Sequence, residues 1–201
     1  MESIDDVRVR ELEHRFKNIL TITRSIVSQT LRSAKSLEDA RKVIDERLAC
    51  LNGAVDLLRT SHWQAAPLGD LAKRALRVFA GYEGRIHVDG PSVSVGPSAS
   101  FTLALVIHEL VTNAIKYGAL SNSAGSVDLT WRVSGEGKTA ELSMLWTERG
   151  GPPVMRPKQQ GFGSRLIGTA ASRSFRGRAE LNYSEAGVTW SLVAPLSAMG
   201  A

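Results

Sequence analysis

The chain has 201 residues, of which 43% are hydrophobic and 22% are charged, so its composition excludes a mainly disordered protein. Its formal net charge of +5 would suit a nucleic-acid-binding protein, but Lys and Arg are scattered and no zinc-finger or RNA-binding spacing appears. A phosphate-bearing small molecule or an acidic protein partner explains the charge as well, and we expect no nucleic acid. Cys50 is the single cysteine, which excludes an internal disulfide and a thiolate metal cluster.

The sequence carries no sign of a membrane span or a leader. It contains no uninterrupted run of 18 apolar residues, and its first residues, MESIDDVRVRELEHRF, lack the apolar stretch of a signal peptide. The use of a single cysteine suits a reducing compartment. We therefore expect a soluble, cytoplasmic protein.

Two long helices are predicted at the N-terminus. No Gly or Pro occurs between Asp5 and Leu31, and a bundle-like seam recurs at alternating spacings of four and three: Leu12, Phe16, Ile19, Thr23, Ile26 and Thr30. Ser36 is the expected N-cap of the second helix, whose apolar face has six members: Leu37, Ala40, Ile44, Leu51, Val55 and Leu58. Two helices cannot enclose a core, so we expect an antiparallel hairpin that dimerises as a four-helix bundle. A monomer whose seam packs on the rest of the chain is the alternative.

A different pattern begins after Pro67 and Gly69 interrupt the helical spacing. We place a domain boundary between residues 64 and 65, with the hairpin over 1–64 and a second domain over 65–201. That domain is expected to have helices near 68–80, 98–117 and 164–175, strands near 85–88, 126–133 and 139–146, and a final hairpin of strands 178–183 and 188–194. This order predicts an α+β fold, a two-layer sandwich of helices on a sheet.

Four polar residues share one face of the helix expected near 98–117. They are spaced three or four positions apart: Glu109, Thr112, Asn113 and Lys116. A carboxylate and an amide oxygen one turn apart suit Mg²⁺, which prefers oxygen ligands and is often shared with substrate phosphates. Lys116 would then neutralise phosphate charge. The alternative is an ordinary solvated helix face.

Two glycine-containing segments follow, Trp146–Pro152 and Gly161–Ser164. Glycines at the ends of strands and helices let the backbone approach a ligand closely, and a helix N-terminus offers free N–H groups to phosphate. Either segment alone is more often a turn. Together with the polar helix face, in this order, they favour a site for a phosphate-bearing ligand.

These segments resemble the HWE family of bacterial histidine kinases. Residues 108–121, HELVTNAIKYGALS, are similar to its N-box, Trp146 and Glu148 match its Trp-x-Glu motif, and Gly161 and Gly163 follow in order. Residues 11–18, ELEHRFKN, are similar to its HRxKN phosphoacceptor box. The resemblance implies a Bergerat-type (GHKL) ATP-binding sandwich after the helical hairpin. The implied activity is that of a protein-histidine kinase of a two-component system, which uses ATP and Mg²⁺ to phosphorylate itself and then a response-regulator aspartate.

The resemblance also implies residue roles. His14 is the phosphoacceptor, while Glu109 and Asn113 belong to the magnesium and phosphate site. Lys116 and Tyr117 lie by the phosphates or ribose, and His108 and Trp146 belong to the nucleotide-binding motifs. Glu148 stands where most related kinases place an adenine-reading aspartate. Four glycines belong to the ATP-lid loop: Gly150, Gly151, Gly161 and Gly163.

His14 can also be interpreted from its place in the helix. If Leu12 and Phe16 are core positions of a heptad, His14 falls on the outer face, where a second domain can reach it. A neutral imidazole leaves one nitrogen able to attack a γ-phosphate. Many other histidine kinases have an acidic residue directly after the histidine, but Arg15 stands there and Glu13 precedes, so the general base stays open.

Some residues also have simpler structural interpretations. Trp146 is equally a core aromatic, His108 points about 100° from Glu109 on the helix and orients its neighbours, and Cys50 is a small core residue. One alternative function is a non-enzymatic histidine phosphotransferase with a degenerate ATP-binding domain, which would show an eroded nucleotide site. A related ATPase or serine kinase that does not use His14 is a second alternative.

Overall fold

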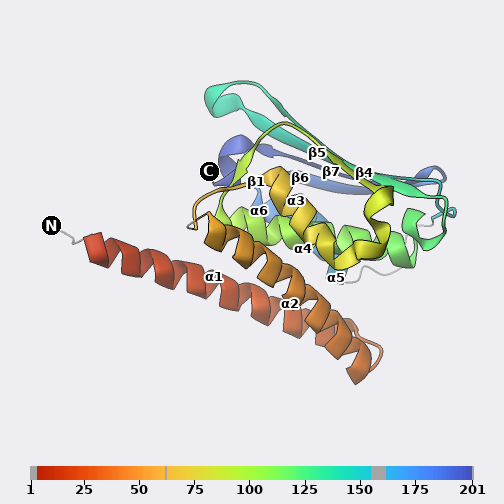
Figure 1. The fold of residues 1–201 in the computed structure, drawn as a ribbon, viewed down its shortest axis with the longest axis horizontal. Helices are drawn as coiled ribbons and strands as arrows, with labels where there is room; N and C mark the ends of the chain where they lie inside the picture. The colour runs from red at the N-terminus through yellow and green to blue at the C-terminus, as the bar shows by residue number, and fades with distance from the viewer. Residues whose placement is uncertain (1–3, 62, 155–161, 201) are drawn as a thin grey trace. The chain divides into compact units, whose positions relative to one another are not determined.

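The computed structural model describes residues 4–61, 63–154 and 162–200, and the side chains of residues 4–16, 18, 33 and 162 lie outside this description (Figure 1). The chain divides into two compact units, Met1–Leu48 and Ala49–Ala201. The helix α2 (Leu37–Thr60) begins in the first unit and ends in the second. The functional boundary expected between residues 64 and 65 stays a prediction.

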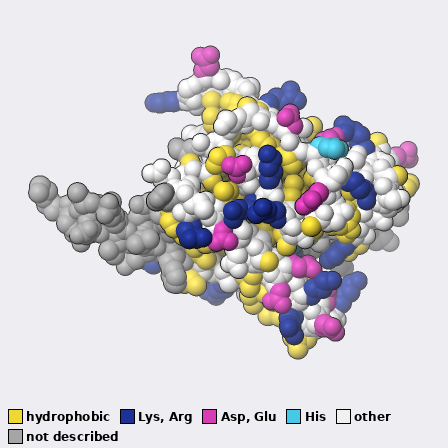
Figure 2. All heavy atoms as spheres, viewed as in Figure 1, with side chains coloured by type: hydrophobic (Ala, Val, Ile, Leu, Met, Phe, Trp, Pro, Cys, Tyr) yellow, Lys and Arg dark blue, Asp and Glu magenta, His cyan; other side chains and the backbone are white. Residues whose placement is uncertain are grey.

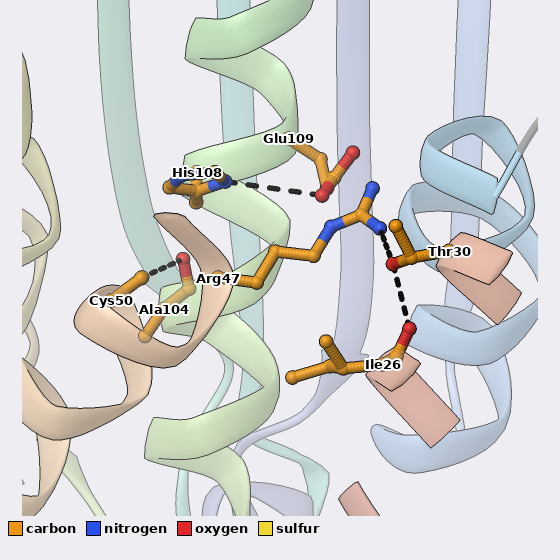
Figure 3. A network of polar contacts seen from close by, with 7 residues as sticks. All are labelled: Ile26, Thr30, Arg47, Cys50, Ala104, His108 and Glu109. Carbon is orange, nitrogen blue, oxygen red and sulfur yellow. Dashed lines mark hydrogen bonds and ion pairs between the residues drawn. The ribbon is translucent and has the colours of Figure 1, made fainter. Parts of the chain in front are cut away.

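The first unit is the expected helical hairpin. It contains α1 (Ile4–Ser33) and the first half of α2. The turn between the helices is capped as expected, because Ser36 Oγ accepts the Asp39 N–H at 3.0 Å and the Asp39 carboxylate accepts the Lys35 N–H at 3.1 Å. Arg47 Nη1 on α2 donates to Thr30 Oγ1 on α1 at 2.6 Å, which joins the helices by a buried polar contact (Figure 3).

The second unit contains a five-stranded sheet with the order β2-β4-β5-β7-β6. The strands are β2 (Ile86–Asp89), β4 (Ser126–Ser134), β5 (Glu141–Arg149), β6 (Arg178–Ser184) and β7 (Gly187–Pro195). β2 pairs with β4 in parallel, and the other neighbours are antiparallel. A separate two-stranded sheet, β1 (Ala66–Pro67) with β3 (Ser94–Val95), was not predicted, because two-residue strands leave no periodic pattern in a sequence.

Helices cover one face of the five-stranded sheet (Figure 1). They are α3 (Leu68–Leu76), α4 (Pro97–Lys116), and a continuous helix formed by α5 (Phe162–Arg165), a π-helical turn (Leu166–Ala170) and α6 (Ala171–Ser174). Alternate side chains of β5 and β7 point into this layer, and Trp146 and Trp190, which are opposite each other in the ladder, are fully buried. Leu145, which lies between Met144 and Trp146 in β5, is 38% exposed on the other face. The α+β sandwich and the helical hairpin are therefore confirmed.

The structure corrects the end of one helix. The helix expected over 68–80 ends at Leu76, and a 3₁₀ segment (Arg77–Arg85) follows, in which Phe79 has non-helical dihedral angles. Gly81 and Gly84 lie in this segment, and glycine disfavours continuation of an α-helix.

The longest helix of the second unit is a core helix. α4 is 20 residues long with a mean hydropathy of 1.3 in its most apolar window, so its length and composition alone would suit a membrane span. However, 72% of that window is buried inside the structure. Pro97 at its first position suits a helix start, and most of its side chains face the sheet or the neighbouring helices, which accounts for its apolar character.

Candidate nucleotide-binding site

The C-terminal half of α4 carries the predicted magnesium ligands. Glu109 is only 4% exposed, Asn113 one turn later is half-buried, and Lys116 and Tyr117 at the end of the helix are exposed. Leu110 and Ala114 on the other faces are buried in the core. The polar face predicted from spacing therefore runs from the interior at Glu109 to solvent at Lys116.

Gly163 lies directly against this polar face. A Cβ placed on Gly163 would lie 2.6 Å from Glu109 Oε2 and 3.7 Å from Asn113 Nδ2. A Cβ there would force the Glu109 carboxylate to move, so glycine lets the backbone of α5 approach both side chains as they lie in the structure. The structure thus brings together three of the residues selected from the sequence, on segments some 50 residues apart.

Glu148 ends the buried face of β5 and is 4% exposed. Its Oε2 accepts the backbone N–H of Ala119 at 2.8 Å, and its Oε1 accepts the Trp146 indole N–H at 3.2 Å. Burial raises the pKa of the Glu148 carboxyl, and these two hydrogen bonds act in the opposite direction. Trp146 is therefore both a core aromatic and a partner of Glu148.

The loop that follows α4 packs directly against the Glu148 side chain. A Cβ at Gly118 would collide with Glu148 Oε2, and a Cβ at Gly151 would lie 2.6 Å from the Cα of Ala119. Gly150 has a φ of 68°, in the left-handed region that favours glycine. Gly150 and Gly151 were expected to approach a ligand, and the structure shows that they approach the backbone of the 118–125 loop. Their role in an ATP lid stays a prediction.

Two buried polar atoms of α4 have no hydrogen-bond partner among the described residues. They are Nδ1 of His108 and Oγ1 of Thr112. His108 is 2% exposed, its ring contacts Phe79 with centroids 5.2 Å apart, and its Nδ1 lies 3.9 Å from Glu109 Oε1, beyond hydrogen-bonding distance (Figure 3). A hydroxyl buried between Glu109 and Asn113 along the helix is the kind of group that a polar ligand satisfies.

Two sequence-selected residues lie outside the described part of this site. Gly161 is not described, and for His14 the structure describes only the backbone, within α1. Their predicted roles stay predictions.

Some contacts in the site were not expected from the sequence. The Ala119 amide lies within the matched string HELVTNAIKYGALS, but a backbone donor leaves no trace in residue type. Cys50, expected to be a small core residue, is buried and its thiol donates to the Ala104 carbonyl at 3.3 Å (Figure 3). Burial, with a smaller contribution from the charge of Glu109, raises the pKa of Cys50 to about 12.

On the face drawn in Figure 2, the described Lys and Arg side chains alternate with Asp and Glu and do not form one basic stripe. On this face the distribution agrees with the scattered positive charge of the sequence.

The fold is of the class found in solved histidine-kinase cores, a helical hairpin followed by a GHKL-type sandwich. The structure is similar to the blue-light activated histidine kinase EL346 of Erythrobacter litoralis, with a TM-score of 0.66 at 16% identity over 98% of this chain and 61% of that one. The histidine kinase domain of EL346 gives a TM-score of 0.60, also at 16% identity, over 93% of this chain and 96% of that one. At this identity the likeness shows the fold.

Sequence comparisons give a family match over part of the chain. Residues 11–92 match the model of the HWE histidine kinase family. The chain is 35% identical over 189 residues to the blue-light-activated histidine kinase of Brucella ovis, and 37% identical over 190 residues to that of Brucella anthropi. These alignments cover 94% of this chain and 39% of each relative, so the chain spans about two fifths of their length. Residues 11–92 are thus similar to the HWE histidine kinase family, and nearly the whole chain is similar to part of the blue-light-activated histidine kinases.

Proposed function

We propose that this chain is the catalytic core of a sensor histidine kinase that acts in the cytoplasm. It uses ATP and Mg²⁺ to phosphorylate its own His14 and passes the phosphoryl group to an aspartate of a response-regulator receiver domain. The observation that carries the proposal is that Glu109 and Asn113 lie directly against the backbone of Gly163. Glu148 is buried near the end of β5, the central strand of the same sandwich. The family match supports the same reaction.

The residues present fit Mg²⁺ shared with phosphates. The described residues contain no group of three or more His, Cys, Asp or Glu side chains that could hold a metal by themselves. Mg²⁺ commonly takes only one or two protein oxygens and completes its shell with water and substrate phosphates. Glu109 and Asn113 would supply those oxygens, and the buried Thr112 hydroxyl lies between them in sequence.

The residues present also fit an adenine base. The Glu148 carboxylate accepts two hydrogen bonds, from Ala119 and Trp146, and a carboxylate has about four acceptor positions. The remaining positions would accept from the adenine amino group. Because both existing donors are fixed, the carboxylate is oriented before the base binds.

In phosphoryl transfer, positioning and charge neutralisation do most of the work. Bound Mg²⁺ supplies positive charge to the transferring phosphoryl group. Lys116, exposed at the end of α4, would add a second positive charge at the phosphates. His14 would form an N–P bond as the bond to the bridging oxygen of ADP breaks, and its N–H proton would pass to a base, for which Glu13 is the carboxylate adjacent in sequence.

A histidine phosphotransferase with a degenerate ATP-binding domain would show an eroded nucleotide site. Instead, Glu109, Asn113 and Gly163 are retained and adjacent. Glu148 is retained with both of its donors. The geometry therefore favours the kinase.

Nucleotide binding tests the proposed site. In the purified chain, Asn113→Ala is expected to weaken Mg²⁺-ATP binding by about tenfold or more, measured by calorimetry, since a hydrogen bond or ligand contact to a charged group contributes about 1.5–3 kcal/mol. Asn182→Ala on the exposed strand β6 is the matched control and should bind ATP like the unmodified chain. Equal affinity for all three chains would contradict the site, and absence of ATP binding in the unmodified chain would favour the phosphotransferase.

We also propose a homodimer formed through the helical hairpin. Leu20 and Leu31 on α1 are both more than half exposed, and their separation of 11 positions brings them to the same helix face at about 100° per residue. The molar mass in solution should be about twice the chain mass of 21.7 kDa. Replacing both leucines by lysine should give the single-chain mass, whereas Val78→Lys, at an exposed apolar residue of the second unit, should not. A single-chain mass before any substitution would favour the monomer.

A further inference from the structure

Arg85 ties together the two ends of the loop that follows α4. It is half-buried at the end of the 3₁₀ segment, directly before β2. Its Nε donates to the Gly125 carbonyl at 2.7 Å and its Nη2 donates to the Ala119 carbonyl at 3.1 Å. The guanidinium carbon also lies 5.9 Å from the centre of the Tyr82 ring, which supports one orientation of the side chain.

The loop between these carbonyls is tightly packed. A Cβ at Gly125 would collide with the Ala119 carbonyl oxygen, so the two ends of the loop are in direct backbone contact. Asn122 Oδ1 accepts the N–H groups of Ala124 and Gly125 at 3.0 and 2.8 Å, and its Nδ2 donates to the Gly150 carbonyl at 3.0 Å. Arg85 and Asn122 therefore hold the loop in one arrangement against the strand end that carries Glu148.

The same alanine joins Arg85 to the nucleotide site. Ala119 receives a hydrogen bond from Arg85 at its carbonyl and donates its N–H to Glu148 Oε2 at 2.8 Å. The Ala119 N–H shares its peptide plane with the Gly118 carbonyl, which accepts the Ser121 N–H at 3.0 Å in the short 3₁₀ turn Ala119–Ser121. Arg85 holds the next peptide plane of this turn through the Ala119 carbonyl. Together these two contacts restrain the direction in which the Ala119 N–H points.

We propose that Arg85 is a positioning residue for base recognition. Through Ala119 it holds the Glu148 carboxylate in the orientation that accepts the amino group of adenine. The planar guanidinium donates to two carbonyls at once, and a lysine ammonium at this position lacks that fixed fork. This inference rests on the proposed function, in which Glu148 reads the base.

The test compares Arg85→Ala and Arg85→Lys with Arg132→Ala, whose side chain is exposed on β4. Affinities for Mg²⁺-ATP and Mg²⁺-inosine triphosphate are measured by calorimetry, since inosine carries an oxygen where adenine carries the amino group. Arg85→Ala should reduce the preference for ATP by about tenfold with little change for inosine triphosphate. Arg85→Lys should lie between, and Arg132→Ala should match the unmodified chain. A merely structural role would weaken both nucleotides equally, and that result would overturn the proposal.

Amide hydrogen exchange without nucleotide tests whether Arg85 holds the 119–125 loop, independently of ATP binding. Arg85→Ala should accelerate exchange over residues 119–125 and leave β5 and β7 protected, which also shows that the variant is folded. Unchanged exchange over this loop would show that Arg85 does not hold it, and would overturn the proposal whatever the nucleotide affinities are. If exchange rises but the unmodified chain shows no preference for ATP, base reading by Glu148 in the proposed function is wrong, and the role given to Arg85 falls with it.

Discussion

The Glu148 carboxyl group is buried and accepts hydrogen bonds from two fixed donors. Its ionisation therefore affects the stability of the folded chain. Burial raises its pKa above the ordinary value of 4.5, so the folded state binds this proton more tightly than the unfolded state does. Its contribution to stability is therefore fully present below about pH 4.5 and is lost as the pH rises through the raised pKa.

Glu148→Gln removes this titration. The free energy of unfolding of the unmodified chain, minus that of the variant, should decrease as the pH rises above about 4.5. The variant carries a separate cost that does not depend on pH, because its amide NH₂ must face the donor of Ala119 or Trp146. Denaturant titrations of both chains from pH 4 to pH 8 measure the difference, and an increase with pH would contradict the assigned direction.

Cys50 gives a second prediction for a single residue. With a pKa raised to about 12, only about one part in ten thousand of this thiol is ionised at pH 8, and the thiolate is the reactive form. A thiol-specific reagent should leave the folded chain unlabelled and should label it stoichiometrically in denaturant. Rapid labelling of the folded chain would show that α2 does not hold Cys50 against the Ala104 carbonyl.

At the scale of elements, the π-helical turn between α5 and α6 is fixed by a tryptophan from the sheet. Trp190 Nε1 donates to the Ile167 carbonyl at 2.6 Å, and both residues are fully buried. Trp190→Phe keeps an aromatic ring but leaves that carbonyl without this donor. The free energy of unfolding should fall by about 2–4 kcal/mol, from the lost bond and the smaller ring.

Trp131→Phe is the matched control for this prediction. Trp131 donates in the same way to the Pro91 carbonyl at 2.8 Å, but Pro91 is exposed, so water can replace the lost donor. Trp131→Phe should lower the free energy of unfolding by less than Trp190→Phe does in the same denaturant titration. Equal costs would mean that burial of the acceptor does not matter here.

The order and type of the main elements could be predicted because their signals are local. Spacing defined α1, α2 and α4, alternation defined β5, and Ser36 marked a helix start that the structure confirms. The early end of α3 was missed although Gly81 and Gly84 follow it, and β1 and β3 were missed because two-residue strands leave no periodic pattern. In the candidate site, Glu109 and Asn113 could be selected because their side chains are of the types that suit a magnesium and phosphate site. Ala119 and Arg85 could not, because Ala119 acts through its backbone N–H and the Arg85 side chain donates to backbone carbonyls.

At the scale of the whole molecule, α2 is the element shared by both compact units. It starts in the unit that contains His14 and ends in the unit that contains the candidate nucleotide site, where Cys50 contacts α4. Phosphorylation of His14 by this nucleotide site requires the γ-phosphate and the imidazole to meet in line.

The most direct test of this account is to locate the phosphoryl group. The purified chain is incubated with γ-labelled ATP and Mg²⁺ beside His14→Ala and His87→Ala, the latter at an exposed histidine on β2 that serves as the control. The account predicts label that is stable in alkali and labile in acid, present in the unmodified and His87→Ala chains and absent from His14→Ala. Label that persists in His14→Ala, or no label in a chain that binds ATP, would contradict it.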